Sequence, residues 1–143
     1  GIEIIIQNLS RLDETVGDED ALGVHNTMNI LENLVEIFPS TMPNLICEKT
    51  QILKYLLLRL KPKVFDSNKL YCSEILSILL QTIDSSNQRR LCCLYGMDGL
   101  ETLLQIIHQC RKVDTLAHDE QECIQNILLC LSCIVAIPSH QDK

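Results

Sequence analysis

Hydrophobic positions along this chain recur with the period of an α-helix in almost every segment. Leucine, isoleucine, valine and cysteine return at every third or fourth position, and polar residues fill the positions between them. Because an α-helix has about 3.6 residues per turn, this spacing gathers the apolar side chains on one face. No segment alternates with period two over any length, so no β-sheet is expected. Helices are predicted at residues 2–12, 22–38, 44–48, 50–60, 66–83, 88–95, 98–111 and 119–137.

The segments between these helices carry turn signals or charge. Asp13 to Ala21 reads DETVGDEDA, which predicts a solvated acidic loop. Pro39 and Pro43 end the second helix, because proline lacks a backbone donor. Asp84-Ser85-Ser86 predicts a turn, and residues 113–118 predict a second polar connection.

The stretch from Asp66 to Ile83 is the most apolar of the long helices. Asp66 or Ser67 can cap its N-terminus by accepting a hydrogen bond from the first turn. Apolar residues cover most of the circumference of the helix and leave a narrow polar strip. This strip consists of Ser73, Glu74, Ser77 and Gln81. Such a helix needs other helices on several sides, and residues 124–137 have the same character.

An internal repeat supplies these neighbours. The pattern Ile-Leu-x-x-Leu begins at Ile30, Ile75 and Ile127, with steps of 45 and 52 residues. Each unit consists of a short, a medium and a longer apolar helix, which is the signature of armadillo and HEAT arrays. We therefore predict an all-α, right-handed superhelical array of about three units in one domain, 1–143. The units are expected at about 1–38, 42–83 and 85–137.

Composition narrows the function further. Hydrophobic residues make up 46% of the chain, aromatic residues only 3%, and tryptophan is absent. The formal net charge of −7 disfavours non-specific nucleic-acid binding and an anionic membrane surface, and it permits basic partners. No apolar run approaches the roughly 20 residues that span a bilayer. The chain begins with Gly1 inside a helical pattern, so we expect a fragment of a longer protein that continues or covers its apolar array ends by self-association.

Catalytic and metal chemistry is not expected. Most of the eight cysteines lie within apolar helical runs, which predicts reduced, buried thiols. Cys130 and Cys133 form a CxxC and Cys92-Cys93 a vicinal pair, but neither has the second ligand pair that zinc requires. The four histidines are scattered, and no glycine-rich phosphate loop is present. We predict a protein without enzymatic activity, cofactor, metal or small-molecule substrate.

Basic side chains gather at one helix end, at Arg59, Lys61, Lys63 and Lys69. Cations at a helix C-terminus complement exposed carbonyl groups, which is the simpler interpretation. The alternative is contact with RNA or an acidic protein segment. The absence of interleaved aromatic residues disfavours RNA.

The polar strips of the long helices are the candidate binding site. In an armadillo array these helices line a groove that holds extended peptides, in which Asn binds the peptide backbone and Glu attracts Lys or Arg. The alternative is an ordinary solvated surface. The expected binding residues are Asn29, Glu32, Asn33, Glu36, Ser73, Glu74, Ser77 and Gln81. The tryptophan ladder of nuclear-import receptors is missing, which disfavours a regular import groove.

Short stretches across nearly all 143 residues also match one known family. They are Gln7 to Leu9, Arg11 to Glu14, Gly23 to Thr27, Glu32-Asn33, Phe65-Asp66, Asn68 to Glu74, Ile78 to Gln81, Asp98-Gly99, Leu103 to Gln105 and Glu120 to Glu122. In these stretches the chain resembles the β-catenin-like protein 1 family, whereas residues 38–50 and 83–96 share only helical character with it.

The resemblance implies a nuclear, non-enzymatic adaptor associated with the spliceosome. Members of that family join the complex around the Myb-domain splicing factor and bind basic segments of splicing proteins. The expected partners are therefore splicing factors with basic segments, without direct RNA contact and without a membrane. The alternative function is a nuclear-transport adaptor for basic cargo peptides.

Overall fold

The computed structural model describes residues 1–9, 11–12, 14, 17–62, 65–81, 87–110 and 117–135. Every regular element in these ranges is an α-helix, as the hydrophobic spacing predicts. The helices are α1 (Ile2–Leu9), α2 (Asp18–Ile37), α3 (Met42–Lys49), α4 (Ile52–Leu60), α5 (Ser67–Gln81), α6 (Asn87–Gly96), α7 (Gly99–Cys110) and α8 (His118–Val135).

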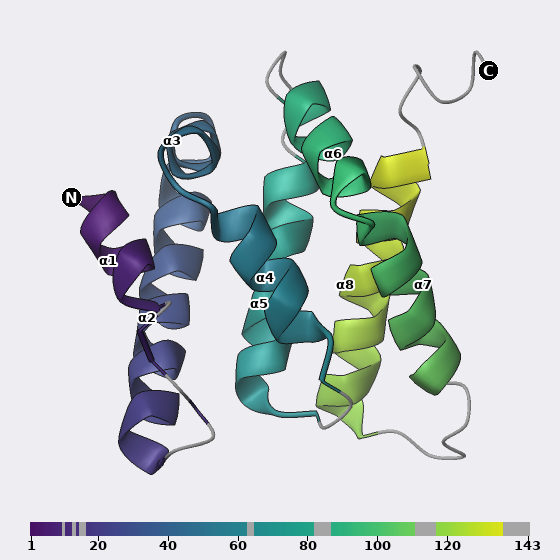
Figure 1. Cartoon of the computed structure of the whole chain (residues 1–143), viewed down its shortest axis with the longest axis horizontal. Coiled ribbons are helices and arrows are strands. Elements are labelled where there is room, and N and C mark those ends of the chain that lie inside the picture. The colour runs from purple at the N-terminus through teal and green to yellow at the C-terminus, as the bar shows by residue number, and fades with distance from the viewer. Residues whose placement is uncertain are drawn as a thin grey trace.

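The three longest helices form one layer. Figure 1 shows α2, α5 and α8 side by side and running in the same direction, with α5 in the middle. The medium helices α1, α4 and α7 form a second layer, and each packs against the long helix that follows it in the sequence. The short helices α3 and α6 precede α4 and α7 and cross near one end of the layers. This arrangement repeats the order short, medium, long from α3 to α5 and from α6 to α8.

The central helix α5 lies in the middle of the hydrophobic core. Leu76, Leu79 and Leu80 are fully buried, because α2, α4 and α8 cover three sides of α5. Cys72 of α5 contacts Met28 of α2 through their sulfur atoms, 3.9 Å apart. The expectation that this helix is enclosed by its neighbours is confirmed. Asp66 caps it as predicted, since its Oδ1 accepts the Lys69 backbone N–H at 2.8 Å.

The last helix is only partly enclosed. Leu128, Leu129 and Val135 of α8 are about half exposed, while Ile127, Cys130 and Ile134 are buried against the rest of the molecule. Helix α8 packs on α5, α6 and α7, so this apolar face points away from all three. The description of α8 ends at Val135, so the predicted end at residue 137 lies outside the described residues.

Two of the predicted boundaries differ from the structure by more than two residues. The first helix ends at Leu9 rather than at residue 12. The backbone N–H groups of Arg11 and Leu12 donate to the carbonyl groups three residues earlier, which is not the α-helical pattern. Helix α2 begins at Asp18 and absorbs the second half of the predicted acidic loop. Asp18, Glu19 and Asp20 form its first turn, where carboxylates favourably face the positive end of the helix dipole. Residues 82–86 and 111–116, with the predicted turn at Asp84 and most of the second connection, lie outside the described residues.

The junction of α6 and α7 requires a glycine. Asp98 has a positive φ of 59°, which places the chain in the left-handed region just before α7. A Cβ atom on Gly99 would lie 2.5 Å from the carbonyl oxygen of Leu94, closer than any side chain tolerates. Gly99 therefore lets α7 turn back tightly against the end of α6.

Candidate functional site

Two glutamates from neighbouring long helices meet on the surface shared by α2 and α5. Glu32 lies on α2 and Glu74 on α5, and their side chains share a hydrogen bond. Burial, this hydrogen bond and the negative charges of Glu74 and Glu36 raise the pKa of Glu32 to about 8. All of these influences act in the same direction, so nothing among them compensates the negative charge. Two carboxyl groups held this close share a proton at neutral pH unless a cation joins them.

One oxygen of Glu32 is left unsatisfied. Its Oε2 is buried from solvent and accepts no hydrogen bond from the residues that the structure describes. A buried acceptor without a donor costs about 1–3 kcal/mol, so the site gains when a donor arrives. The groups best able to supply several donors and a positive charge at once are an ammonium and a guanidinium.

An aromatic pair also joins α2 to α5. His25 of α2 and Tyr71 of α5 are in edge-to-face contact, with ring centroids 5.0 Å apart and an interplanar angle of 73°. Tyr71 precedes Glu74 by three residues, which places both on one strip of α5. His25 and Tyr71 were not among the binding residues expected from the sequence. Their signal was the spacing His25, Asn29, Glu32 and Glu36 on α2, which repeats every three or four residues.

We define the α2–α5 surface by the side chains on these two strips. It comprises His25, Asn29, Glu32, Asn33 and Glu36 of α2, with Tyr71, Glu74 and Gln81 of α5. The side chains of Asn29, Asn33, Glu36 and Gln81 are exposed, and those of Glu32 and Glu74 are half-buried. The structure therefore brings Glu32 and Glu74 together and leaves the two Asn residues and Gln81 open to solvent.

Two of the predicted binding residues do not belong to this surface. Ser73 is 0% exposed and Ser77 is 5% exposed, because α8 packs over that side of α5. The Ser73 Oγ donates to the Leu70 carbonyl at 2.7 Å and accepts from Asn126 Nδ2 of α8 at 3.2 Å. The Ser77 Oγ donates to the Glu74 carbonyl at 2.8 Å. The two hydroxyl groups thus help to hold α5 and α8 together, and their expected place in an exposed strip is corrected.

The basic cluster serves the fold rather than an open surface. Arg59 binds Glu14 through Nη2–Oε1 at 3.0 Å and Asp66 through Nη2–Oδ2 at 2.7 Å. Asn68 Nδ2 donates to the same Glu14 carboxylate at 2.7 Å. Lys69 is 5% exposed and its ammonium donates to the Pro62 carbonyl. These contacts fasten Glu14 to the corner between α4 and α5 and leave Lys61 as the exposed cation of the cluster in the described part of the chain, since Lys63 lies outside it.

The cysteines of α5 and α8 behave as packing residues, whereas Cys92 and Cys93 of α6 are exposed. Cys72, Cys123 and Cys130 are buried, and burial raises the pKa of the Cys130 thiol to about 12. Burial also raises the pKa of Cys133, the other member of the CxxC. Both thiols are therefore protonated at neutral pH. Within the described ranges no three His, Cys, Asp or Glu side chains are placed to hold a metal ion.

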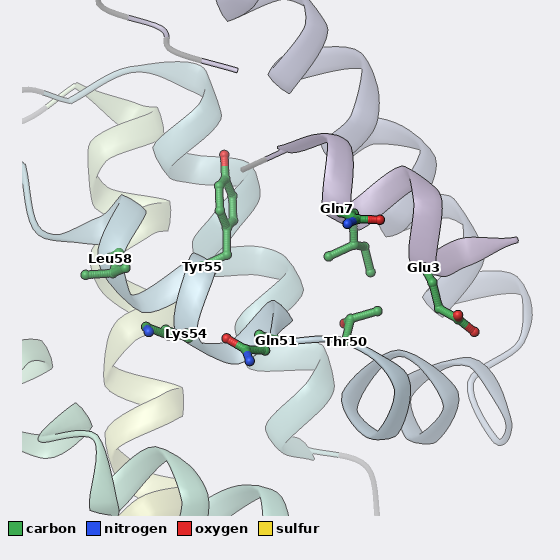
Figure 2. Close-up of a pocket in the computed structure, with 8 residues that line it drawn as sticks. Glu3, Gln7, Thr50, Gln51, Lys54, Tyr55 and Leu58 are labelled. Atoms are coloured by element: carbon green, nitrogen blue, oxygen red, sulfur yellow. The ribbon is translucent and has the colours of Figure 1, made fainter. Parts of the chain in front are cut away.

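A separate pocket of about 660 Å³ opens in the other layer, between α1 and α4. Figure 2 shows Gln7 and Glu3 on one wall, Lys54 and Leu58 on the opposite wall, and Thr50 and Gln51 below. The two charges on its walls have opposite signs, so the pocket favours neither acidic nor basic ligands.

None of the described helices is long and apolar enough to cross a membrane.

Comparison with known proteins shows which family this chain belongs to. The family model described as "Catenin-beta-like, Arm-motif containing nuclear" matches residues 2–143. Beta-catenin-like protein 1 of Homo sapiens is 40% identical over 145 residues, covering 99% of this chain and 24% of the human protein. The Mus musculus protein of that name is 41% identical over 98% of this chain. Beta-catenin-like protein 1 homolog of Schizosaccharomyces pombe is 27% identical over 94% of this chain.

The chain spans about a quarter of the length of these relatives. The match to the family model extends over both helical layers and includes every helix of the α2–α5 surface. With its all-α fold and its armadillo-type order of helices, the chain belongs to the catenin-beta-like, Arm-motif containing nuclear family.

Proposed function

We propose that this chain is a non-enzymatic, nuclear scaffold of pre-mRNA splicing, and that its α2–α5 surface binds basic segments of splicing factors. The observation that carries the proposal is the Glu32–Glu74 pair, in which no cation of the described residues lies between two facing carboxyl groups. A lysine or arginine side chain of a partner supplies both the positive charge and the donors that this pair lacks.

The surroundings of the pair support binding of an extended peptide. Asn29 and Asn33 are exposed amides on the same helix, and an amide can donate to and accept from a peptide backbone. Glu36 lies one turn beyond Glu32 and adds a further exposed negative charge. The net charge of −7 attracts basic segments from a distance.

The basic cluster gives no support to an RNA-binding function. Arg59 is engaged by two carboxylates and Lys69 is buried, so neither offers its charge to a phosphate backbone. The negative charge of the whole chain opposes a polyanion as well. A protein partner with basic segments fits both charge patterns.

A binding titration with a lysine- and arginine-rich peptide tests the proposal. The double variant Glu32→Lys with Glu74→Lys should weaken binding at least about tenfold, since it replaces attraction with repulsion at the centre of the surface. The matched control is Glu3→Lys with Glu101→Lys, which changes the net charge equally on exposed positions of α1 and α7. Far-ultraviolet circular dichroism checks that both variants stay helical. Equal binding by the two double variants would move the site away from α2 and α5.

A further inference from the structure

The Glu32–Glu74 pair has a property that an ordinary exposed acidic surface lacks. Exposed carboxylates are ionised at neutral pH and attract cations without exchanging protons. Glu32 instead combines a buried, unsatisfied oxygen with a second carboxyl group directly opposite on α5. Such a pair has two stable occupants, a shared proton or a cationic group that bridges both carboxylates.

The groups around Glu32 leave the proton as the occupant of the free protein. Among the residues that the structure describes, the charges acting on Glu32 are Glu74 from α5 and Glu36 from α2 itself. Helices α1 and α3, which also pack against α2, add none of the charges that act on Glu32. His25 is the remaining titratable side chain on the α2 strip, and it contacts Tyr71 rather than Glu32.

Resting on the proposed function, we propose that the Glu32–Glu74 pair is a proton-linked subsite, which holds one proton in the free protein and releases it when a lysine or arginine side chain of the bound peptide takes its place. The proton passes to the solvent, both carboxyl groups become ionised, and no covalent bond other than the carboxyl O–H breaks. The incoming cation donates to both carboxylates and thereby satisfies the Oε2 atom of Glu32.

This exchange makes peptide binding depend on pH. Binding of the basic peptide strengthens as the pH rises through the neutral range, because less proton remains to be displaced. An exposed carboxylate would show no such dependence, since it carries no proton to lose at neutral pH. The pH of the surroundings therefore tunes how tightly this surface holds its partner.

Calorimetric titration with a lysine- and arginine-rich peptide at pH 7, in two buffers of different ionisation enthalpy, counts the protons released on binding. The wild-type chain should release close to one proton per peptide. Glu32→Gln should release almost none and bind more weakly, since glutamine imitates the protonated carboxyl group and cannot be ionised. Glu3→Gln removes an exposed carboxylate of α1, and Glu101→Gln removes one of α7, both outside the α2–α5 surface. Both controls should keep the release seen in the wild type.

The outcomes separate the inference from the proposed function. Peptide binding without proton release, or equal release by Glu32→Gln and the wild type, overturns the proton linkage and leaves the peptide-binding proposal standing. The absence of any binding overturns both. A carbon-13 titration of the side-chain carboxyl groups of the free chain provides a test that needs no peptide. Glu32 should titrate near pH 8, and titration at its ordinary value of 4.5 would overturn the inference.

Discussion

Helix α5 contacts two clusters of charged side chains, which differ in whether a cation neutralises their carboxyl groups. At its N-terminal end, Arg59 lies between the carboxylates of Glu14 and Asp66 and satisfies both. Nearer the middle, Glu74 faces Glu32, and in the part of the chain that the structure describes no cation lies between them. The first cluster is complete within the chain and holds a corner of the fold together. The second is incomplete, so it is the one that a basic partner can complete.

The largest expected effect is a loss of stability, caused by truncating a side chain in the hydrophobic core beneath both clusters. Leu76→Ala should lower the free energy of unfolding by about 2–5 kcal/mol, because Leu76 is fully buried at the centre of α5 and leaves a cavity when truncated. Chemical denaturation followed by circular dichroism measures the change. Leu128→Ala, an equally large truncation on the half-exposed face of α8, should cost much less. Similar losses for the two variants would mean that α5 is not the central helix of the packing.

Breaking the complete cluster comes next in size. Arg59→Ala should lower the free energy of unfolding by about 2–3 kcal/mol, since it leaves the Glu14 and Asp66 carboxylates without their shared donor. The exposure of Asp66 moderates the loss. Lys61→Ala, which removes an exposed cation two residues away, should change stability by less than about 0.5 kcal/mol. Peptide binding should survive both substitutions, and a peptide that loses affinity with Arg59→Ala would contradict the structural role of this cluster.

The incomplete cluster should show a smaller effect that depends on pH. The pKa of Glu32 rises from an ordinary value of 4.5 to about 8 on folding, chiefly through burial. Between these pH values the native chain holds a proton that the unfolded chain has released, so its stability falls as the pH rises and levels off above about 8. Thermal unfolding across this range should show a flatter profile for Glu32→Gln than for Glu36→Gln. Parallel profiles for the two variants would contradict the raised pKa of Glu32.

Helix type and order could be predicted from the sequence because hydrophobic periodicity is a local signal. The cap at Asp66 and the enclosed character of α5 followed from the residues of that segment alone. The start of α2 was harder to predict, because its first turn is acidic and has the composition of a loop. Carboxylates at this position are stabilised by the positive end of the helix dipole.

The candidate site depended on contacts between segments far apart in the chain. Glu32 meets Glu74 across 42 positions of the sequence only because α2 and α5 lie in parallel with a particular register. The burial of Ser73 was equally hidden, since it depends on how α8 packs over α5. Helical spacing identified the polar strip of α5, but only the packing of α8 separated its open residues from its covered ones.

Chemical-shift mapping of a lysine- and arginine-rich peptide on the isotope-labelled chain locates the peptide-binding surface. The largest shifts are expected on the α2–α5 surface, at Asn29, Glu32 and Glu74. Shifts concentrated at Gln7, Gln51 and Lys54, in the pocket between α1 and α4, would contradict this expectation (Figure 2).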